Sequence, residues 1–235
     1  MAINAQSKGN AGGPPQIPAG THHGITYGVI DIGTQPPPPG SSFPARRKVV
    51  FMWELPRVRA DFEDEQTKKK VNKPRAISKT FTLSLAKNSK LKPFLEGWRG
   101  RGFTAEELKA FDVSKLMGVN CLLTVVHENG KGDNAGNVYA NVSAASKLMD
   151  GMNVQKPENT PLTFSFDDIK GSEIVFPKNM PEWVQKRIMQ SDEFIHLQQQ
   201  HGVPGAGSEL SQREQERREA NQNPTGAPDE ESVPF

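Results

Sequence analysis

The stretch Arg46-Arg47-Lys48-Val49-Val50-Phe51-Met52-Trp53-Glu54-Leu55 has the alternating pattern of a half-buried β-strand. Large apolar side chains occupy its odd-numbered positions from Val49 onward, and successive side chains of a strand point to opposite faces of a sheet. Pro56 follows directly and has no amide hydrogen to donate to a neighbouring strand, so we expect the strand to end there. These residues put a β-sheet at the centre of the fold.

Further strands are predicted on both sides of this segment. A charged loop is expected over 57–74, and after it residues 78–85 alternate large apolar side chains with hydroxyl side chains. The other predicted strands are 25–32, 120–127 and 138–144, with a short extra strand at 162–166.

Two short helices are predicted between the third and fourth strands. Residues 90–98 carry apolar side chains at helical spacing, and Thr104 with Glu107 forms the capping box of a helix that begins at Ala105. The order is therefore three strands, a helical region and two strands. This is the order of an OB-fold, which binds oligonucleotides on its second and third strands and its hairpin loops. The sequence thus predicts a mainly β protein with short helices, built on a five-stranded OB-fold barrel.

Composition divides the chain into four parts. The first and last parts are rich in Gly, Pro, Asn and Gln and have too few large apolar side chains to offset the entropy of ordering, so we expect both to be disordered. Pro181 suits the first position of a helix that continues to about Gln199 and packs on the barrel. The predicted parts are a disordered N-terminal arm (1–20), an OB-fold nucleic-acid-binding domain (21–150), an extension with that helix (151–200) and a disordered acidic tail (201–235).

The charge of the chain is unevenly distributed. Its 29 Lys and Arg and 27 Asp and Glu give a net charge of +2, but residues 45–110 carry +9, residues 111–185 carry −3 and residues 186–235 carry −4. A basic half joined to an acidic end suits a surface that binds a polyanion and a tail that can compete for it. The alternative is a solvated surface whose charge is uneven by chance.

Simple counts exclude several classes of protein. The single cysteine, Cys121, cannot form an internal disulfide, so a secreted disulfide framework is excluded and a reducing compartment is expected. The longest apolar runs, 49–53 and 121–126, are too short to span a bilayer, and the first residues lack the pattern of a secretory signal. We expect a soluble cytoplasmic protein that does not associate with membranes.

Catalytic signatures are absent from the sequence. The five histidines and acidic pairs such as Asp167-Asp168 show no spacing typical of a zinc or metallo-nuclease site. No Gly-rich phosphate loop and no nucleophile-elbow motif occurs. We therefore expect a binding protein rather than an enzyme, with no cofactor and no metal.

The last residues combine acidic and apolar side chains. Asp229, Glu230 and Glu231 precede Val233-Pro234-Phe235, which ends in the carboxylate of the chain. A partner can take the ring into a pocket while Lys or Arg at the rim meets the carboxylates. This order resembles the C-terminal tip of bacterial single-stranded DNA-binding proteins, with Val233 in place of Ile and Ser232 in a position that the family usually gives to an acid. The resemblance implies recruitment of replication or recombination proteins; the alternative is a solubilising acidic tail.

A second resemblance lies in the body of the chain and covers roughly residues 45–148. Trp98-Arg99-Gly100-Arg101-Gly102-Phe103, Phe111-Asp112 and the segment from Val126-His127-Glu128 to Tyr139-Ala140-Asn141-Val142 look like small single-stranded DNA-binding and related uncharacterised proteins of tailed phages and prophages. The resemblance implies support of replication and recombination on phage DNA, in the cytoplasm of the host. It does not identify the contact residues.

The contact residues are assigned from physical reasoning instead. Non-specific binding of a single strand needs a cationic groove along the phosphates and aromatic faces on which bases stack. Each ring can instead fill the core, and for Trp53 the core is favoured because its strand face also carries Val49 and Leu55. The predicted cations are Arg46, Arg47, Lys48, Lys73, Arg75, Lys79, Lys87, Arg99 and Arg101, and the candidate stacking rings are Tyr27, Trp53, Trp98 and Tyr139.

The sequence therefore predicts a protein that binds single-stranded DNA without strong sequence preference and recruits partners through its acidic tip. The alternative is an OB-like adaptor that binds protein and has no affinity for nucleic acid. The sequence does not determine the oligomeric state, so a homo-oligomer is possible. It also leaves open whether the protein prefers DNA or RNA.

Overall fold

The computed structural model describes residues 16–37, 40–63, 67–130, 135–169 and 174–200. The acidic tail with its tip, and most of the predicted N-terminal arm, lie outside the described residues. Residues 16–20 were expected to be disordered, and for these the expectation is wrong. Ile17 is buried in the core, and Gly20 begins the first strand.

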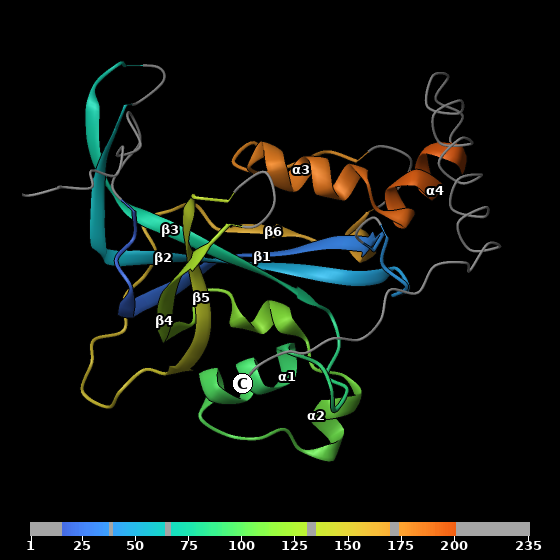
Figure 1. The fold of residues 1–235 in the computed structure, drawn as a ribbon, viewed down its shortest axis with the longest axis horizontal. Helices are drawn as coiled ribbons and strands as arrows, with labels where there is room; N and C mark the ends of the chain where they lie inside the picture. Colours follow the sequence, from blue (N-terminus) through green and yellow to red (C-terminus); the bar gives the residue numbers. More distant parts are fainter. Residues whose placement is uncertain (1–15, 38–39, 64–66, 131–134, 170–173, 201–235) are drawn as a thin grey trace, which may run out of the picture.

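A mainly β fold is observed, with few short helices (Figure 1). Five strands form antiparallel neighbours in the order β3-β2-β1-β4-β5, and the short β6 pairs in parallel with β1. The strands are β1 (Gly20–Gln35), β2 (Arg46–Glu63), β3 (Lys70–Thr82), β4 (Asn120–Asn129), β5 (Val138–Lys147) and β6 (Leu162–Phe164).

The sheet is open: the predicted mainly β fold is confirmed, whereas closure of the strands into a barrel is not observed in the part of the chain that the structure describes. Among the described residues, β3 and β5 are the two ends of the strand path, and no ladder of hydrogen bonds joins them. The predicted short extra strand is confirmed as β6, which pairs beside Gly28–Ile30 of β1 and brings the sheet to six strands.

Strand β2 is longer than its sequence pattern predicts. It continues through Pro56 because the pairing with β3 shifts between Leu55 and Arg59, so the residues between them form a bulge in which proline needs no ladder partner. Most of the predicted charged loop is therefore a hairpin. Its strands, Arg59–Glu63 and Lys70–Pro74, form a ribbon that extends from the body of the molecule, which we call the arm (Figure 1).

From Val49 to Leu55 both faces of β2 are buried, so the prediction of a half-buried strand is wrong. Its odd-numbered side chains, such as Phe51 and Trp53, pack in an inner core against helix α1 (Leu91–Arg99) and β4. Its even-numbered side chains Val50 and Met52 belong to an outer core under helix α3 (Glu182–Met189).

The extension covers the outer face of β1 and β2. Val184 and Ile188 of α3 are buried in the outer core, whereas Trp183 remains 44% exposed. The predicted single helix is two helices, because the chain breaks at Gln190–Ser191 before α4 (Asp192–Gln200). The buried Ser191 hydroxyl donates to the Ile188 carbonyl and accepts from the Phe194 amide, which satisfies the groups freed by the break.

The short helix α2 (Ala105–Lys109) begins as predicted. The Thr104 hydroxyl accepts from the Glu107 amide, and the Glu107 carboxylate accepts from the Thr104 amide, so the capping box is confirmed. Short turns of 3-10 helix follow at Val113–Leu116 and Phe166–Asp168.

Candidate nucleic-acid interface

A groove of about 530 Å³ lies between β3 and the β4–β5 hairpin, at the open edge of the sheet. Two of the predicted contact residues, Arg75 and Tyr139, line it together. The other lining residues are Gln16, Ile17, Ala76, Ile77, Ser78, Glu128, Asn129, Val138, Ala140 and Asn141.

One face of β3 leads from the arm into this groove. Alternate residues of a strand share a face, so Val71, Lys73, Arg75, Ile77 and Lys79 all lie on the same side. Ile77 is buried in the inner core, which identifies this side as the concave one. Three cations are thus spaced along about 20 Å of strand, at 3.3 Å per residue.

The β4–β5 hairpin contributes a small polar cluster around one ring. Tyr139, which is 43% exposed, lies directly opposite Glu128 in the strand register. Asn141 lies two residues further along β5, and its side-chain amide donates to Oε2 of Glu128 at 2.7 Å. We call Glu128, Tyr139 and Asn141 the hairpin cluster. It joins an aromatic face to a carboxylate held in place by an amide.

Lys79 spans the opening between the end strands. Its ammonium group donates to the Val142 carbonyl of β5 and lies 5.5 Å and 5.9 Å from the ring centres of Phe81 and Phe94. Burial lowers the pKa of Lys79. The predicted DNA contact is therefore directed across the gap between β3 and β5, where it links the two strands.

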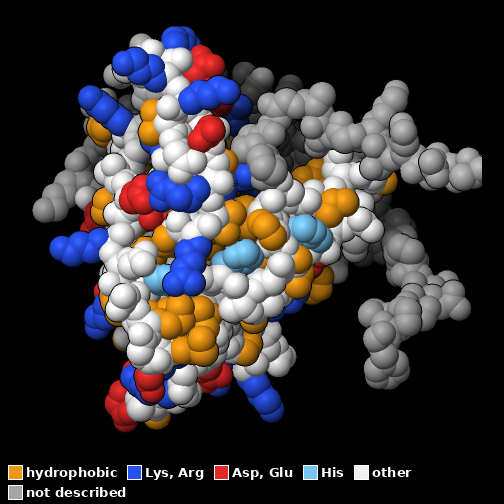
Figure 2. All heavy atoms as spheres, turned by 90° about the vertical axis from the view of Figure 1, so that its left-hand side faces the viewer, with side chains coloured by type: hydrophobic (Ala, Val, Ile, Leu, Met, Phe, Trp, Pro, Cys, Tyr) orange, Lys and Arg blue, Asp and Glu red, His pale blue; other side chains and the backbone are white. Residues whose placement is uncertain are grey.

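The arm carries cations and an apolar pair. Phe62 and Val71 are directly opposite each other, on the same face as Lys73. On the other face, Arg59 donates to both carboxylate oxygens of Glu158, at 2.6 Å and 3.0 Å, and this contact braces the arm against the extension. Figure 2 shows Lys and Arg side chains gathered on the upper part of the face that carries the arm, with a few Asp and Glu among them.

Two of the predicted stacking rings are in the core. Trp53 is fully buried and Trp98 is 2% exposed, and their ring centres lie 5.6 Å apart. Neither presents a face to a ligand, so both assignments are corrected. Tyr27 is half-buried against the outer core, and burial with the nearby Glu54 carboxylate raises its pKa to about 12.

Arg99 and Arg101 stabilise the loop around α2. The Arg99 guanidinium lies 4.3 Å from the Phe103 ring centre and 5.0 Å from that of Phe111, and it donates to the Glu107 carboxylate. Arg101 donates to both oxygens of the same carboxylate, at 2.7 Å and 2.9 Å. These hydrogen bonds lower the pKa of Glu107 to about 2. Arg99 is thus a packed side chain and not a phosphate contact.

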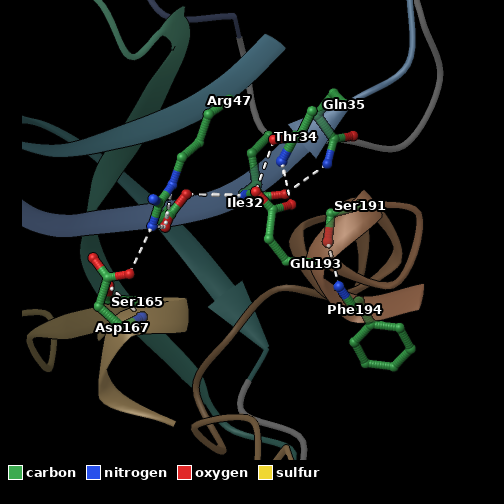
Figure 3. Close-up of polar contacts among 11 residues, drawn as sticks. Ile32, Thr34, Gln35, Arg47, Ser165, Asp167, Ser191, Glu193 and Phe194 are labelled. Atoms are coloured by element: carbon green, nitrogen blue, oxygen red, sulfur yellow. Dashed lines mark hydrogen bonds and ion pairs between the residues drawn. The ribbon is translucent and has the colours of Figure 1, made fainter. Parts of the chain in front are cut away.

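The basic run at the start of β2 lies at the opposite end of that strand from the arm. Arg47 donates to the Asp31 carboxylate at 3.0 Å and 2.5 Å and also reaches Asp167 (Figure 3). Arg46 is exposed and Lys48 is half-buried beside it, while Lys87 is exposed in the loop before α1. The predicted cations are therefore divided among β3, the loop around α2, the start of β2 and the loop before α1.

The same region of the structure ties the extension to the sheet. Both the amide and the hydroxyl of Thr34 donate to Glu193 of α4, at 2.6 Å and 2.7 Å, and Gln35 donates to the Arg187 carbonyl at 2.9 Å (Figure 3). Gly33, directly before Thr34, has φ +70°, and an added Cβ would lie 2.6 Å from Cβ of Ser191. The polar contacts here are structural.

Sequence reasoning did not assign Glu128, Asn141 and Ser78 to the site. For Glu128 and Asn141 the signal was the register: once β4 and β5 pair, residues 128 and 139 face each other and residue 141 follows on the same side. That register depends on the length of the hairpin loop, which strand alternation alone does not provide.

Other kinds of site were sought within the described residues. No group of three or more His, Cys, Asp or Glu side chains there could hold a metal ion. In the same part of the chain, no helix is long and apolar enough to cross a membrane.

Comparisons with models of known protein families, with curated proteins and with solved structures found no match to this chain.

Proposed function

We propose that this protein binds single-stranded DNA without strong sequence preference, in the groove between β3 and the β4–β5 hairpin. One observation carries the proposal: the groove combines an exposed aromatic ring, Tyr139, with the cationic concave face of β3. Stacking on a ring and neutralisation of phosphates are the two interactions that such binding needs.

The topology supports an OB-like arrangement of the sheet. The first strand pairs with both the second and the fourth, and α1 covers the inner core between the third and fourth strands in the chain. The groove lies where β3 and β5 would meet in a closed barrel. Binding at this edge differs from the face of strands two and three that the sequence favoured, because part of that face is covered by the extension.

The positive net charge of residues 45–110 supports the proposal that the ligand is a polyanion. Residues 45–110 carry a net charge of +9, and Lys73 and Arg75 approach the groove from the arm. Arg47, Arg99 and Arg101 lie outside the lining of the groove, so the proposed contact set is narrower than the predicted one and is chosen by position in the groove. It comprises Lys73, Arg75, Tyr139 and their neighbours in the groove.

The role in the cell is proposed from the sequence resemblances. They favour support of replication or recombination on phage DNA, with Asp229, Glu230, Glu231 and the apolar residues after them recruiting protein partners.

A salt titration tests the proposal. Fluorescence anisotropy of a labelled single strand of mixed sequence would be measured with the full chain at several salt concentrations. We expect binding at low salt, and log affinity should fall linearly with log salt because counterions are released from the phosphates. Absence of binding at low salt would overturn the proposal and favour the protein-binding adaptor.

A further inference from the structure

The hairpin cluster sets a carboxylate beside the only aromatic ring among the described residues that line the groove. Glu128 and Tyr139 are directly opposed in an antiparallel pair, where Cβ atoms lie about 5 Å apart. A base stacked on the exposed Tyr139 ring would therefore bring its edge close to Glu128. This is unusual for a site that neutralises phosphates, because a carboxylate repels them.

The Glu128 carboxylate is held and can accept further hydrogen bonds. Asn141 donates to its Oε2 atom at 2.7 Å, which fixes the orientation of the group. An ionised carboxylate has about four acceptor positions, so one amide does not saturate it. Unlike a side-chain amide, an ionised carboxylate cannot donate a hydrogen bond.

We infer that the hairpin cluster selects bases that carry an exocyclic amino group and disfavours thymine. Adenine, cytosine and guanine each present an amino donor, and a Glu carboxylate accepts from the N4 amino group of cytosine. Thymine presents the O4 acceptor at the position of the cytosine amino group, and its one donor, the N3–H, lies between two carbonyl oxygens that the carboxylate repels. This inference rests on the proposed function and adds a preference at one base position within otherwise non-specific binding.

The test compares two homopolymers of equal length, oligo(dC) and oligo(dT), at mildly alkaline pH, where cytosine is unprotonated. Both bases are pyrimidines, so the comparison isolates the amino group from ring size. We expect the full chain to bind oligo(dC) about threefold to tenfold more tightly, the range of one net hydrogen bond. Glu128→Gln should bring the ratio of affinities close to one, because the glutamine amide can donate to thymine as well as accept from cytosine.

A matched charge control is Asp61→Asn, which removes one negative charge from the arm, outside the groove. It should strengthen binding of both homopolymers equally and leave their ratio unchanged. Thermal unfolding of each variant reports whether the fold is intact.

The possible outcomes are distinct. A preference for oligo(dC) that Glu128→Gln abolishes and Asp61→Asn retains supports the inference. Equal affinities in the unmodified chain, or a ratio that Glu128→Gln does not change, overturns the selectivity while the proposed function stands. Absence of binding to both homopolymers overturns the proposed function as well.

Discussion

Tyr139 supplies the stacking face of the proposed interface. No other ring is among the described residues that line the groove, and the larger rings of Trp53 and Trp98 are buried in the inner core. A ring that is 43% exposed can stack a base on one face while its other face stays on the hairpin.

Replacing this ring should weaken binding. Tyr139→Ala is expected to lower the affinity for a single strand by about 1–3 kcal/mol, the value of one base–aromatic stack. Tyr139→Phe should retain most of the affinity, because the stacking face remains. Phe43→Ala is the matched control, since Phe43 is 68% exposed but lies in the loop before β2, at the end of that strand opposite the arm. Anisotropy titrations would contradict the role of Tyr139 if both alanine variants bound equally well.

Glu107 makes a pH-dependent contribution to stability. Its pKa falls from 4.5 to about 2 in the folded chain because Arg101, the Thr104 amide and Arg99 bind the ionised form. A carboxyl group with a lowered folded pKa stabilises the fold above its unfolded pKa and loses that contribution as the pH falls. The unfolding free energies of the unmodified chain and Glu107→Gln should therefore differ most above pH 4.5 and converge toward pH 2. A difference that stays constant across this window, in denaturant titrations, would contradict the assignment.

Alternation alone could not separate ligand-binding rings from core rings. The side chains of Trp53 and Phe51 point to the same face of β2. Whether that face meets solvent or another layer of the fold depends on α1, which is distant in sequence. Tyr139 was predicted as a contact, and the structure leaves it exposed at the groove.

At the level of elements, strand positions were easier to predict than strand ends. The alternating core of β2 was evident, but the strand runs to Glu63 because a bulge absorbs Pro56. The arm that results was missed, since its charged residues resemble a solvated loop. The capping box of α2 was predicted correctly because all of its interactions are local.

Glu54 anchors the extension to β2. Its buried carboxylate accepts from the amides of Glu158 and Asn159, at 3.0 Å and 2.8 Å, and from the Asn159 side chain at 2.7 Å. Glu54→Ala leaves these donors without an acceptor and should lower the unfolding free energy by about 3 kcal/mol. Glu182→Ala, which removes an exposed carboxylate from α3, should have little effect. Equal stabilities of the two variants in urea titrations would contradict the anchoring role.

At the level of the whole molecule, the two cores determine where a ligand can bind. The inner core fills the concave side of the sheet below α1, and the outer core is covered by α3, which leaves the open edge between β3 and β5 (Figure 1). The net charge of residues 45–110 predicted a polyanion site, but not that many of these cations would be used in ion pairs. Pairing depends on the fold and is not visible in composition.

The acidic tip should compete with the DNA for cations rather than assist binding. Deleting residues 229–235 removes Asp229, Glu230 and Glu231, so the affinity for a single strand should stay equal or increase. The same deletion should abolish recruitment of a replication or recombination partner. Loss of DNA affinity in the truncated protein would contradict this division of roles.

Hydrogen–deuterium exchange with and without a bound single strand tests most directly whether the groove is the binding site. We expect the strand to slow exchange in residues 75–78 of β3 and 138–141 of β5, which line the groove. Exchange in α3 and α4 should not change. Slower exchange confined to the extension, or to the basic run Arg46–Lys48, would contradict the assignment of the groove.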